Sequence, residues 1–365
     1  SWLEQSLEAG RALPGITSSF KALGRSVVPC YLQGLTKRVF DHVSGELLTN
    51  ADPTAVFFIR QFCSSFKKLK RECIERRNLA AIEKFEATDI GLPDHVELDR
   101  VTQSVAHVVL GSLKSFLVDD PRPKHGPGAT YERLLGNQKY TNREFYERWR
   151  GVVDEEDLYG YSYEGSRAIT ILRECDERPC RLSLVPKTLK SPRLIAVEPV
   201  AMQYAQQLVS DELVRSMRTS PLTKHIDFTD QSVNRDLAKR GSIDGSVCTI
   251  DLSEASDRVS LALVQALFES DQYLLDKLLA CRSRTIEIPR RGKLPKRTLV
   301  LKKYSTSGSA LTFPVETLVF FILALATLVR RDVGKGRSIR ASISALAQSV
   351  SVYGDDIVVP SDSCE

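Results

Sequence analysis

Three aspartates carry the strongest chemical signal in this sequence. Asp251 ends the run SVCTID, and Asp355 and Asp356 follow about a hundred residues later in YGDD. β-Branched residues precede both places, so each is predicted to lie at the end of a β-strand. Two strand ends with three carboxylates can hold two Mg²⁺ ions a few ångströms apart. Such a pair of ions stabilises both the attacking and the leaving oxygen of a phosphoryl transfer.

Each of these aspartates also has an ordinary structural explanation. A Gly-Asp-Asp sequence is often a polar hairpin tip, and Gly354 supplies the positive φ that a tight hairpin needs. The apolar runs VSV and IVV bracket the tip, however, and two adjacent carboxylates that repel one another there indicate a bound cation. Asp251 could cap the next helix, although Ser253 or Ser256 could do so instead. Asp257, one turn further on, could accept a hydrogen bond from a substrate hydroxyl or simply favour a helix start.

A basic segment upstream contains groups that could bind phosphate. Residues 181–197, RLSLVPKTLKSPRLIAV, are predicted to form two strands around a basic turn. Lys187, Lys190 and Arg193 in that turn could hold a triphosphate and neutralise a leaving pyrophosphate. Basic turns are common, so this segment alone specifies little.

The sequence SGSALTFPVET is predicted to open a helix at a serine-glycine turn. Ser307 and Gly308 form the turn, which could move when a ligand binds, and a serine hydroxyl could reach a sugar. Thr312 and Glu316 are four residues apart and share one helix face. A plain helix N-cap at Ser305 or Ser307 explains the same residues.

The remaining segments are predicted to be mainly scaffold. Residues 1–115 have largely helical periodicity. The basic loop 118–130, VDDPRPKHGPGAT, is either a connector or a segment that binds phosphate. Residues 260–281 are predicted to be helical, and residues 285–304 to form a hairpin around RRGKLPK. The apolar run LVFFILALATLV at 318–329 is too short to span a bilayer and is predicted to be a buried helix.

Composition favours a soluble globular protein. The chain has 365 residues, 42% of them hydrophobic and 27% charged, enough for two or three subdomains. The net charge of +5 is modest, but basic residues concentrate in 60–77 and 282–303, which suits a polyanion held in a channel. A solvated helix face explains the run at 60–77 equally well. The eight cysteines and five histidines form no zinc-binding pattern, so a reduced cytoplasmic protein is expected. The sequence has no signal-peptide pattern and no initial Met, so we expect a fragment.

The order of the motifs adds a signal that none of them carries alone. VPKT-K-PR, DLSEASD, SG-x₃-T-x₃-ET and YGDD resemble motifs F, A, B and C of viral RNA-dependent RNA polymerases. DLSxASD, TF-x-x-E, YGDDI-x-x-P and HGPGAT are similar to the forms in the replicase β subunit of the single-stranded RNA bacteriophages, the leviviruses. The resemblance covers about residues 118–360 and does not clearly reach residues 1–115.

The resemblance implies an RNA-directed RNA polymerase, a nucleotidyltransferase, with an α+β right-hand fold. Residues 1–117 would be a helical part of the fingers or their support, 118–245 the fingers with the NTP-entry hairpin, and 246–365 the palm. A basic insertion of the fingers would lie at about 282–303. Motif D and the thumb would follow Glu365, so the thumb is expected to be truncated.

The resemblance also implies roles for single residues. Two Mg²⁺ ions, for which Mn²⁺ could substitute, would be held by the catalytic residues Asp251, Asp355 and Asp356. The incoming NTP would be bound by Lys187, Lys190, Arg193, Asp257, Ser307, Gly308, Thr312 and Glu316. The RNA would be contacted by Arg290, Arg291, Lys293, Lys302 and Lys303.

Within the NTP-binding group, the three basic residues would hold the triphosphate. Asp257 would select ribose through its 2′ and 3′ hydroxyls, and Gly308 would make the motif B turn mobile. Many eukaryotic-virus enzymes have Asn where Glu316 stands, and a carboxylate there would pair with ribose differently. The implied partners are a single-stranded RNA template, NTPs, host elongation factors Tu and Ts and a small-subunit ribosomal protein, in the cytoplasm of a bacterial host and without a membrane.

Two alternative functions stay open at this point. A reverse transcriptase shares the two-metal palm, but it tends to place a bulky aromatic residue soon after the first metal-binding aspartate. Residues 252–257, LSEASD, contain no aromatic residue, which favours ribonucleotides. A non-catalytic RNA-binding protein built on a degenerate palm is the other alternative, although all three aspartates are present.

Overall fold

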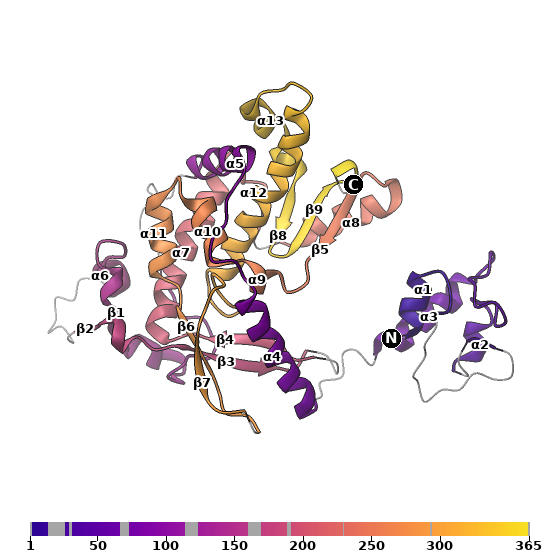
Figure 1. The fold of residues 1–365 in the computed structure, drawn as a ribbon, viewed down its shortest axis with the longest axis horizontal. Coiled ribbons are helices and arrows are strands. Elements are labelled where there is room, and N and C mark those ends of the chain that lie inside the picture. The colour runs from indigo at the N-terminus through magenta and orange to yellow at the C-terminus, as the bar shows by residue number, and fades with distance from the viewer. Residues whose placement is uncertain are drawn as a thin grey trace. The chain divides into compact units, whose positions relative to one another are not determined.

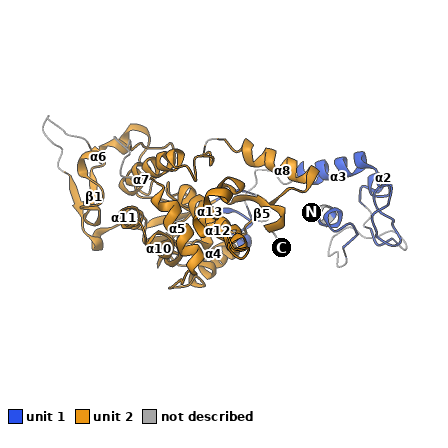
Figure 2. Cartoon of the chain, turned by 90° about the horizontal axis from the view of Figure 1, so that it is seen from above, with its two compact units in different colours: residues 1–78, 185–193 blue, residues 79–184, 194–365 orange. Residues whose placement is uncertain are grey.

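The computed structural model describes two compact units, each with its own core. The described residues are 2–13, 26–28, 31–65, 73–113, 123–159, 169–187, 191–228, 230–292 and 294–363, drawn as a ribbon in Figure 1. Unit 1 comprises Ser1–Asn78 and Val185–Arg193, and unit 2 comprises Leu79–Leu184 and Leu194–Glu365 (Figure 2). Helices and strands occur together, so the expected α+β class is confirmed.

Unit 1 contains three helices in its described part, joined by turns and isolated β-bridges. Its helices are α1 (Trp2–Glu8), α2 (Gln33–Thr36) and α3 (Pro53–Ser65). The Asp52 carboxylate accepts hydrogen bonds from the backbone N–H groups of Thr54 and Ala55, at 2.8 and 3.4 Å, and so caps α3. A small apolar core holds the unit together, and its buried members are Leu3, Val28, Val39, Phe40, Ala55 and Ile59.

Unit 2 contains most of the helices. They are α4 (Glu75–Ile90, which begins in unit 1), α5 (Arg100–Gly111), α6 (Glu155–Tyr159), α7 (Val200–Thr219), α8 (Ser232–Asp244), α9 (Ala255–Arg258), α10 (Leu261–Phe268), α11 (Gln272–Ala280), α12 (Thr312–Val333) and α13 (Ile339–Leu346). Short 3₁₀ helices lie at Gly136–Thr141, Glu147–Trp149, Glu174–Asp176, Ala347–Ser349 and Ser361–Ser363. The predicted helical stretch at 260–281 is therefore present as α10 and α11.

Three sheets accompany these helices. The first has the strand order β5 (Val247–Asp251), β9 (Asp356–Pro360), β8 (Ser351–Tyr353), and all its pairings are antiparallel. The second has the order β4 (Arg193–Val197), β3 (Cys180–Val185), β6 (Thr285–Ile288), β7 (Arg297–Val300). β1 (Glu144–Tyr146) and β2 (Thr170–Leu172) form a parallel pair. The predicted strands before Asp251, around Gly354, in 181–197 and in 285–304 are thus all formed.

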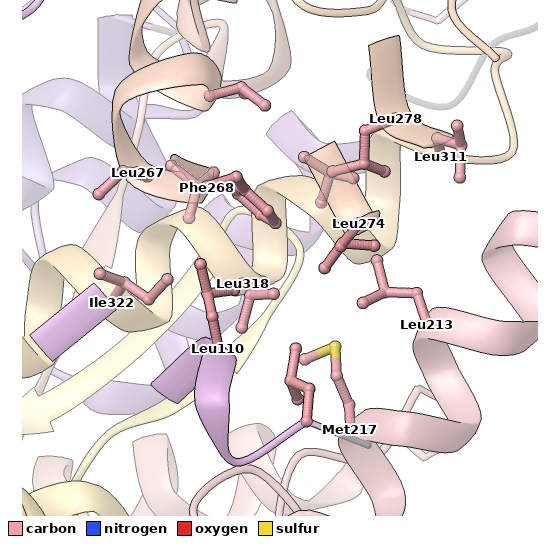
Figure 3. Packing of buried hydrophobic residues seen from close by; sticks show 14 of the residues in the cluster. Leu110, Leu213, Met217, Leu267, Phe268, Leu274, Leu278, Leu311, Leu318 and Ile322 are labelled. Atoms are coloured by element: carbon pink, nitrogen blue, oxygen red, sulfur yellow. The ribbon is translucent and has the colours of Figure 1, made fainter. Parts of the chain in front are cut away.

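The core of unit 2 is built around α12. Leu318 and Ile322 of this helix pack with apolar side chains of α5, α7, α10 and α11 (Figure 3). The helix has 22 residues and is apolar enough to cross a membrane by length and composition, but 78% of its most apolar window is buried inside the protein. The prediction of a buried helix is confirmed. The argument from length was wrong, because the helix extends beyond the apolar run at both ends.

The expectation that all cysteines are reduced is met only in part. Among the residues that the structure describes, five cysteines are free thiols: Cys63, Cys73, Cys175, Cys180 and Cys281. Cys248 in β5 is disulfide-bonded, which the sequence analysis did not expect.

Candidate functional site

The two acidic motifs meet at one end of the β5–β9–β8 sheet. The antiparallel register places Asp251 directly opposite Asp356, and Asp356 in turn opposite Tyr353. Asp355 lies at the tip between β8 and β9, and all three aspartates are exposed. The predicted convergence of the two strand ends is therefore present in the structure.

The tip that carries Asp355 is docked on the start of α12. The backbone N–H of Gly354 donates to the Thr317 hydroxyl at 3.0 Å. Gly354 has a φ of +63°, and a Cβ there would lie only 2.5 Å from the Phe313 ring and 3.3 Å from Glu316 Oε1. Glycine is thus required both for the turn and for the close approach of α12.

Polar side chains near α8 hold Asp356. Gln231 Nε2 donates to Asp356 Oδ2 at 2.6 Å, and Asn234 Nδ2 donates to the Asp356 carbonyl at 2.9 Å. The Ser351 hydroxyl donates to Asn234 Oδ1 at 2.6 Å, which fixes the amide. α8 packs against β5 (Figure 1), and a groove of about 580 Å³ between α8 and the sheet includes Asp251 and Asp356 in its lining. The sequence analysis missed Gln231 and Asn234, because no local pattern marks them.

Glu316 faces the acidic tip from α12. Its side chain is buried, and Oε2 has no hydrogen-bond partner. Burial, with smaller contributions from the charges of Asp355 and Asp257, raises the pKa of Glu316 to about 8. The carboxyl group is therefore mainly protonated at pH 7 in the absence of other ligands, and it can donate a hydrogen bond.

The serine-glycine turn lies beside motif A. The hydroxyls of Ser256 and Ser307 are 3.3 Å apart. Thr312 is buried, and its hydroxyl donates to the Thr306 carbonyl and contacts the Ser305 hydroxyl, both at 2.9 Å. Gly308 has a φ of +121°, and a Cβ there would lie 2.0 Å from the Ala196 carbonyl oxygen in β4. The structure thus brings Ser307 to the site, whereas Thr312 has internal partners.

The predicted triphosphate-binding residues are only partly described. Lys187 and Arg193 are exposed and belong to unit 1, whereas the three aspartates belong to unit 2. Lys190 lies outside the described residues. A role for these three residues stays a prediction.

Comparison with known proteins decides the family. The family model described as RNA replicase, beta-chain, matches residues 173–365, which is more than half of the chain. The chain belongs to this family. The resemblance of its motifs to levivirus replicases is thereby confirmed.

Curated relatives of this replicase chain are polymerase subunits of bacteriophages. The RNA-directed RNA polymerase subunit beta of Qbeta virus (strain MX1) is 35% identical over 181 residues, which are 49% of this chain and 27% of that protein. The beta chain of Escherichia phage MS2 is 33% identical over 179 residues, 49% of this chain and 28% of that protein. The subunit of Enterobacteria phage SP is 38% identical over 176 residues, 48% of this chain and 26% of that protein. The match thus spans about a quarter of these relatives' length.

A solved structure with a weaker likeness is the RNA-dependent RNA polymerase of a human picorbirnavirus. The TM-score is 0.48 at 14% identity, covering 84% of this chain and 58% of that one.

The basic hairpin of this replicase chain is more neutral than its sequence indicates. Lys302 pairs with Asp94 at 2.7 Å, and Arg297 pairs with Glu86 of α4. Lys296 pairs with Glu287 at 2.7 Å, while Arg290 is exposed. Arg291 is half-buried, and Lys293 lies outside the described residues.

One residue of the predicted RNA-binding set is not on the surface. Lys303 is 0% exposed, and its ammonium lies 3.1 Å from Asp257 Oδ1. The expectation that Lys303 contacts the RNA backbone is therefore wrong, because a fully enclosed side chain cannot reach a phosphate.

The donor set fits a hard cation, although it is not assembled into a ligand cluster. Carboxylate oxygens are the ligands that Mg²⁺ prefers. No group of three or more His, Cys, Asp or Glu side chains in the described ranges is arranged to hold a metal ion as it stands. The register of β5 and β9 supplies the backbone placement, and the side chains would have to turn toward a bound ion.

Proposed function

We propose that this chain contains the catalytic centre of an RNA-directed RNA polymerase of levivirus type. The observation that carries the proposal is the β5–β9 register, which sets Asp251 opposite Asp356 and beside the tip that bears Asp355. Family membership and the names of the phage relatives support the same activity. Polymerisation joins the 3′-OH of a growing RNA to the α-phosphate of an NTP and releases pyrophosphate.

The acidic residues would hold the cofactor. Asp251 and Asp355 would bind Mg²⁺, with Asp356 as a third carboxylate kept in place by Gln231. When bound, the ions would supply positive charge to the attacking hydroxyl and to the leaving pyrophosphate. Mn²⁺ has the same preference for oxygen ligands and could take their place.

The remaining residues would bind and orient the nucleotide. Asp257 would accept hydrogen bonds from the ribose hydroxyls, and Ser307 lies close enough to motif A to assist. Glu316 would face the nucleotide from α12, where other enzymes have an amide. Lys187, Lys190 and Arg193 would neutralise the triphosphate. Thr312 would stabilise the serine-glycine turn rather than bind the sugar, because its hydroxyl donates to the Thr306 carbonyl.

The domain assignment and partners follow as part of the proposal. Residues 246–365 would form the palm, 118–245 the fingers, and 1–117 a helical support. RNA would contact the exposed Arg290, with Arg291 and Lys293 beside it in sequence. The name beta chain given to the relatives indicates a subunit of a larger replicase, for which elongation factors Tu and Ts and a small-subunit ribosomal protein are the expected host partners. The setting would be the cytoplasm of a bacterial host.

The test is incorporation of labelled nucleotide on a short RNA template by the complete gene product, with Mg²⁺ and supplied host factors. We expect Asp355→Asn to lower the rate of nucleotide incorporation at least about a hundredfold, because the proposed Mg²⁺ site loses a carboxylate ligand. Asp236→Asn, at an exposed aspartate that pairs with neighbouring Arg235, is the matched control and should retain the parent rate.

Three outcomes separate the alternatives. An Asp355→Asn variant as active as the parent would overturn the proposed site. Preference for dTTP over UTP on the same template would indicate a reverse transcriptase. RNA binding by a folded parent without any incorporation would indicate a non-catalytic palm protein.

A further inference from the structure

Lys303 is a fully enclosed cation next to the proposed nucleotide site. A buried ammonium group is costly unless charged or polar partners surround it. Its Nζ lies 3.1 Å from Asp257 Oδ1 and 3.9 Å from Asp89 Oδ1. The same atom lies 3.6 Å from the centroid of the Phe85 ring, over its face. Two carboxylates and one aromatic ring therefore define the position of the ammonium group.

The backbone around Lys303 is held as firmly as its side chain. The N–H groups of Lys302 and Lys303 donate to the two carboxylate oxygens of Asp89, at 3.1 and 3.0 Å. The Leu261 N–H donates to the Lys302 carbonyl, and the Tyr304 N–H donates to the Val259 carbonyl, both at 2.8 Å. The segment is thereby fastened both to α4 and to the chain that leaves α9. Lys303 thus presents its charge from a rigid support.

Asp257 is the partly exposed partner of the buried Lys303. The Asp257 side chain is 22% exposed, whereas Lys303 is 0% exposed and Asp89 5%. Lys303 engages Oδ1, which restrains rotation of the carboxylate group. Without this contact, the Asp257 carboxylate would lose the cation beside it while staying close to Glu316.

We propose that Lys303 is a positioning residue that orients the Asp257 carboxylate toward the ribose hydroxyls and so sets the preference for ribonucleotides over deoxyribonucleotides. The proposal rests on the proposed function, in which Asp257 is the ribose-binding group. A site built around a substrate hydroxyl rejects the analogue that lacks it, because the polar group of the site is then left unpaired. That discrimination depends on an acceptor held in one orientation, which Lys303 provides.

The test is Lys303→Met, which keeps the length of the side chain and removes its charge. We expect the ratio of kcat/KM for UTP to that for dTTP to fall about tenfold, roughly the contribution of one hydrogen bond to a charged group. Most of the change should be a higher KM for UTP, since an oriented binding contact is lost. The variant should fold, because Asp257 keeps access to water and Asp89 keeps its two N–H donors.

Lys277→Met is the matched control. Lys277 is also buried and pairs with Glu212 at 2.6 Å, but it lies in α11 and its partner in α7. Loss of this pair should lower the free energy of unfolding without changing the UTP to dTTP ratio. A fall in the ratio in both variants would show a general loss of packing and would overturn the proposal.

A double-mutant cycle supplies a second test. In an Asp257→Asn background, Lys303→Met should lower the ratio no further, because both changes act through the same carboxylate. The double variant removes both charges of the pair, so no unpaired charge is left buried. Its comparison with Asp257→Asn therefore tests the proposal even if Lys303→Met alone does not fold. An additive effect would overturn the proposal.

The outcomes also distinguish this proposal from the proposed function. If the parent incorporates UMP and Asp355→Asn does not, but Lys303→Met leaves the ratio at the parent value, only the role of Lys303 is wrong. If the folded parent incorporates neither nucleotide, both are wrong.

Discussion

At the scale of single residues, Gly354 and Gly245 allow the free-energy cost of a left-handed backbone to be measured separately from the cost of overpacking. Their φ values are +63° and +67°, but an added Cβ meets the Phe313 ring at 2.5 Å in the first case and nothing within 4 Å in the second. We expect Gly245→Ala to cost about 1 kcal/mol through the left-handed conformation alone. Gly354→Ala should cost about 1–3 kcal/mol more through overpacking against α12. Urea unfolding of both variants measures the difference, and equal costs would contradict the close approach.

His125 offers a prediction about pH. Its ring stacks on Tyr204 with centroids 4.3 Å apart, and burial together with the charge of Lys139 lowers its pKa to about 4. The unfolded chain binds a proton near pH 6.5, so this group stabilises the fold fully above that pH and loses its contribution as the pH falls toward 4. His125→Phe keeps the stack and cannot titrate.

The measurement compares the two proteins at two pH values. Between pH 7 and 4.5, the parent should lose about 1–2 kcal/mol more free energy of unfolding than His125→Phe, after allowance for the partial exposure of the ring. Urea unfolding at each pH gives both numbers. The same loss in both proteins would mean that His125 is already solvated in the fold.

At the scale of elements, α12 connects the apolar core with the acidic tip. Phe321 on this helix is 0% exposed, so Phe321→Ala should lower the free energy of unfolding by about 3–5 kcal/mol. Thr327→Ala on the exposed side of the same helix is the control and should change it by less than about 0.5 kcal/mol. Chemical denaturation checks both. A small effect of Phe321→Ala would show that the core closes over the lost ring.

The elements that bear the motifs could be predicted from sequence, because their signals are local. β-Branched runs next to aspartate or glycine predicted β5, β8 and β9. In 285–304, apolar and polar residues alternate on either side of a Gly/Pro-containing loop, which predicted β6 and β7. The approach of Asp251 to Asp356 followed from the assumption that the two strand ends meet. The order of the motifs, rather than any one of them, pointed to the family.

The contacts that complete the site could not be predicted, because their partners are distant in the chain. Lys303 looked like part of a basic surface, since its partner Asp89 is 214 residues away. Gln231 and Asn234 reach Asp356 over 125 and 122 residues. Burial of a polar side chain depends on which helix covers it, and a single sequence carries no local signal for that.

At the scale of the whole molecule, charge pairing limits which basic residues could take part in the proposed binding of RNA. The net charge of +5 includes basic residues that α4 and its neighbours already neutralise, such as Lys302 beside Asp94. We expect Arg290→Ala to reduce the slope of log affinity for single-stranded RNA against log salt by about 0.7, the value for one phosphate contact. Lys302→Ala should reduce it less. Fluorescence anisotropy over a KCl series checks this, and equal slopes for parent and Arg290→Ala would remove Arg290 from the interface.

The pairing of β5 with β9 also determines which length changes the gene tolerates. Side chains alternate between the two faces of a strand, so one inserted or deleted codon within 247–251 or 356–360 would turn the following residues over. An insertion in β5 would point Asp251 away from Asp356, and an insertion in β9 would displace Ile357, Val358 and Val359, which are all buried. Whole-codon insertions should therefore be eliminated from β5 and β9, even where each added residue is itself a good strand former.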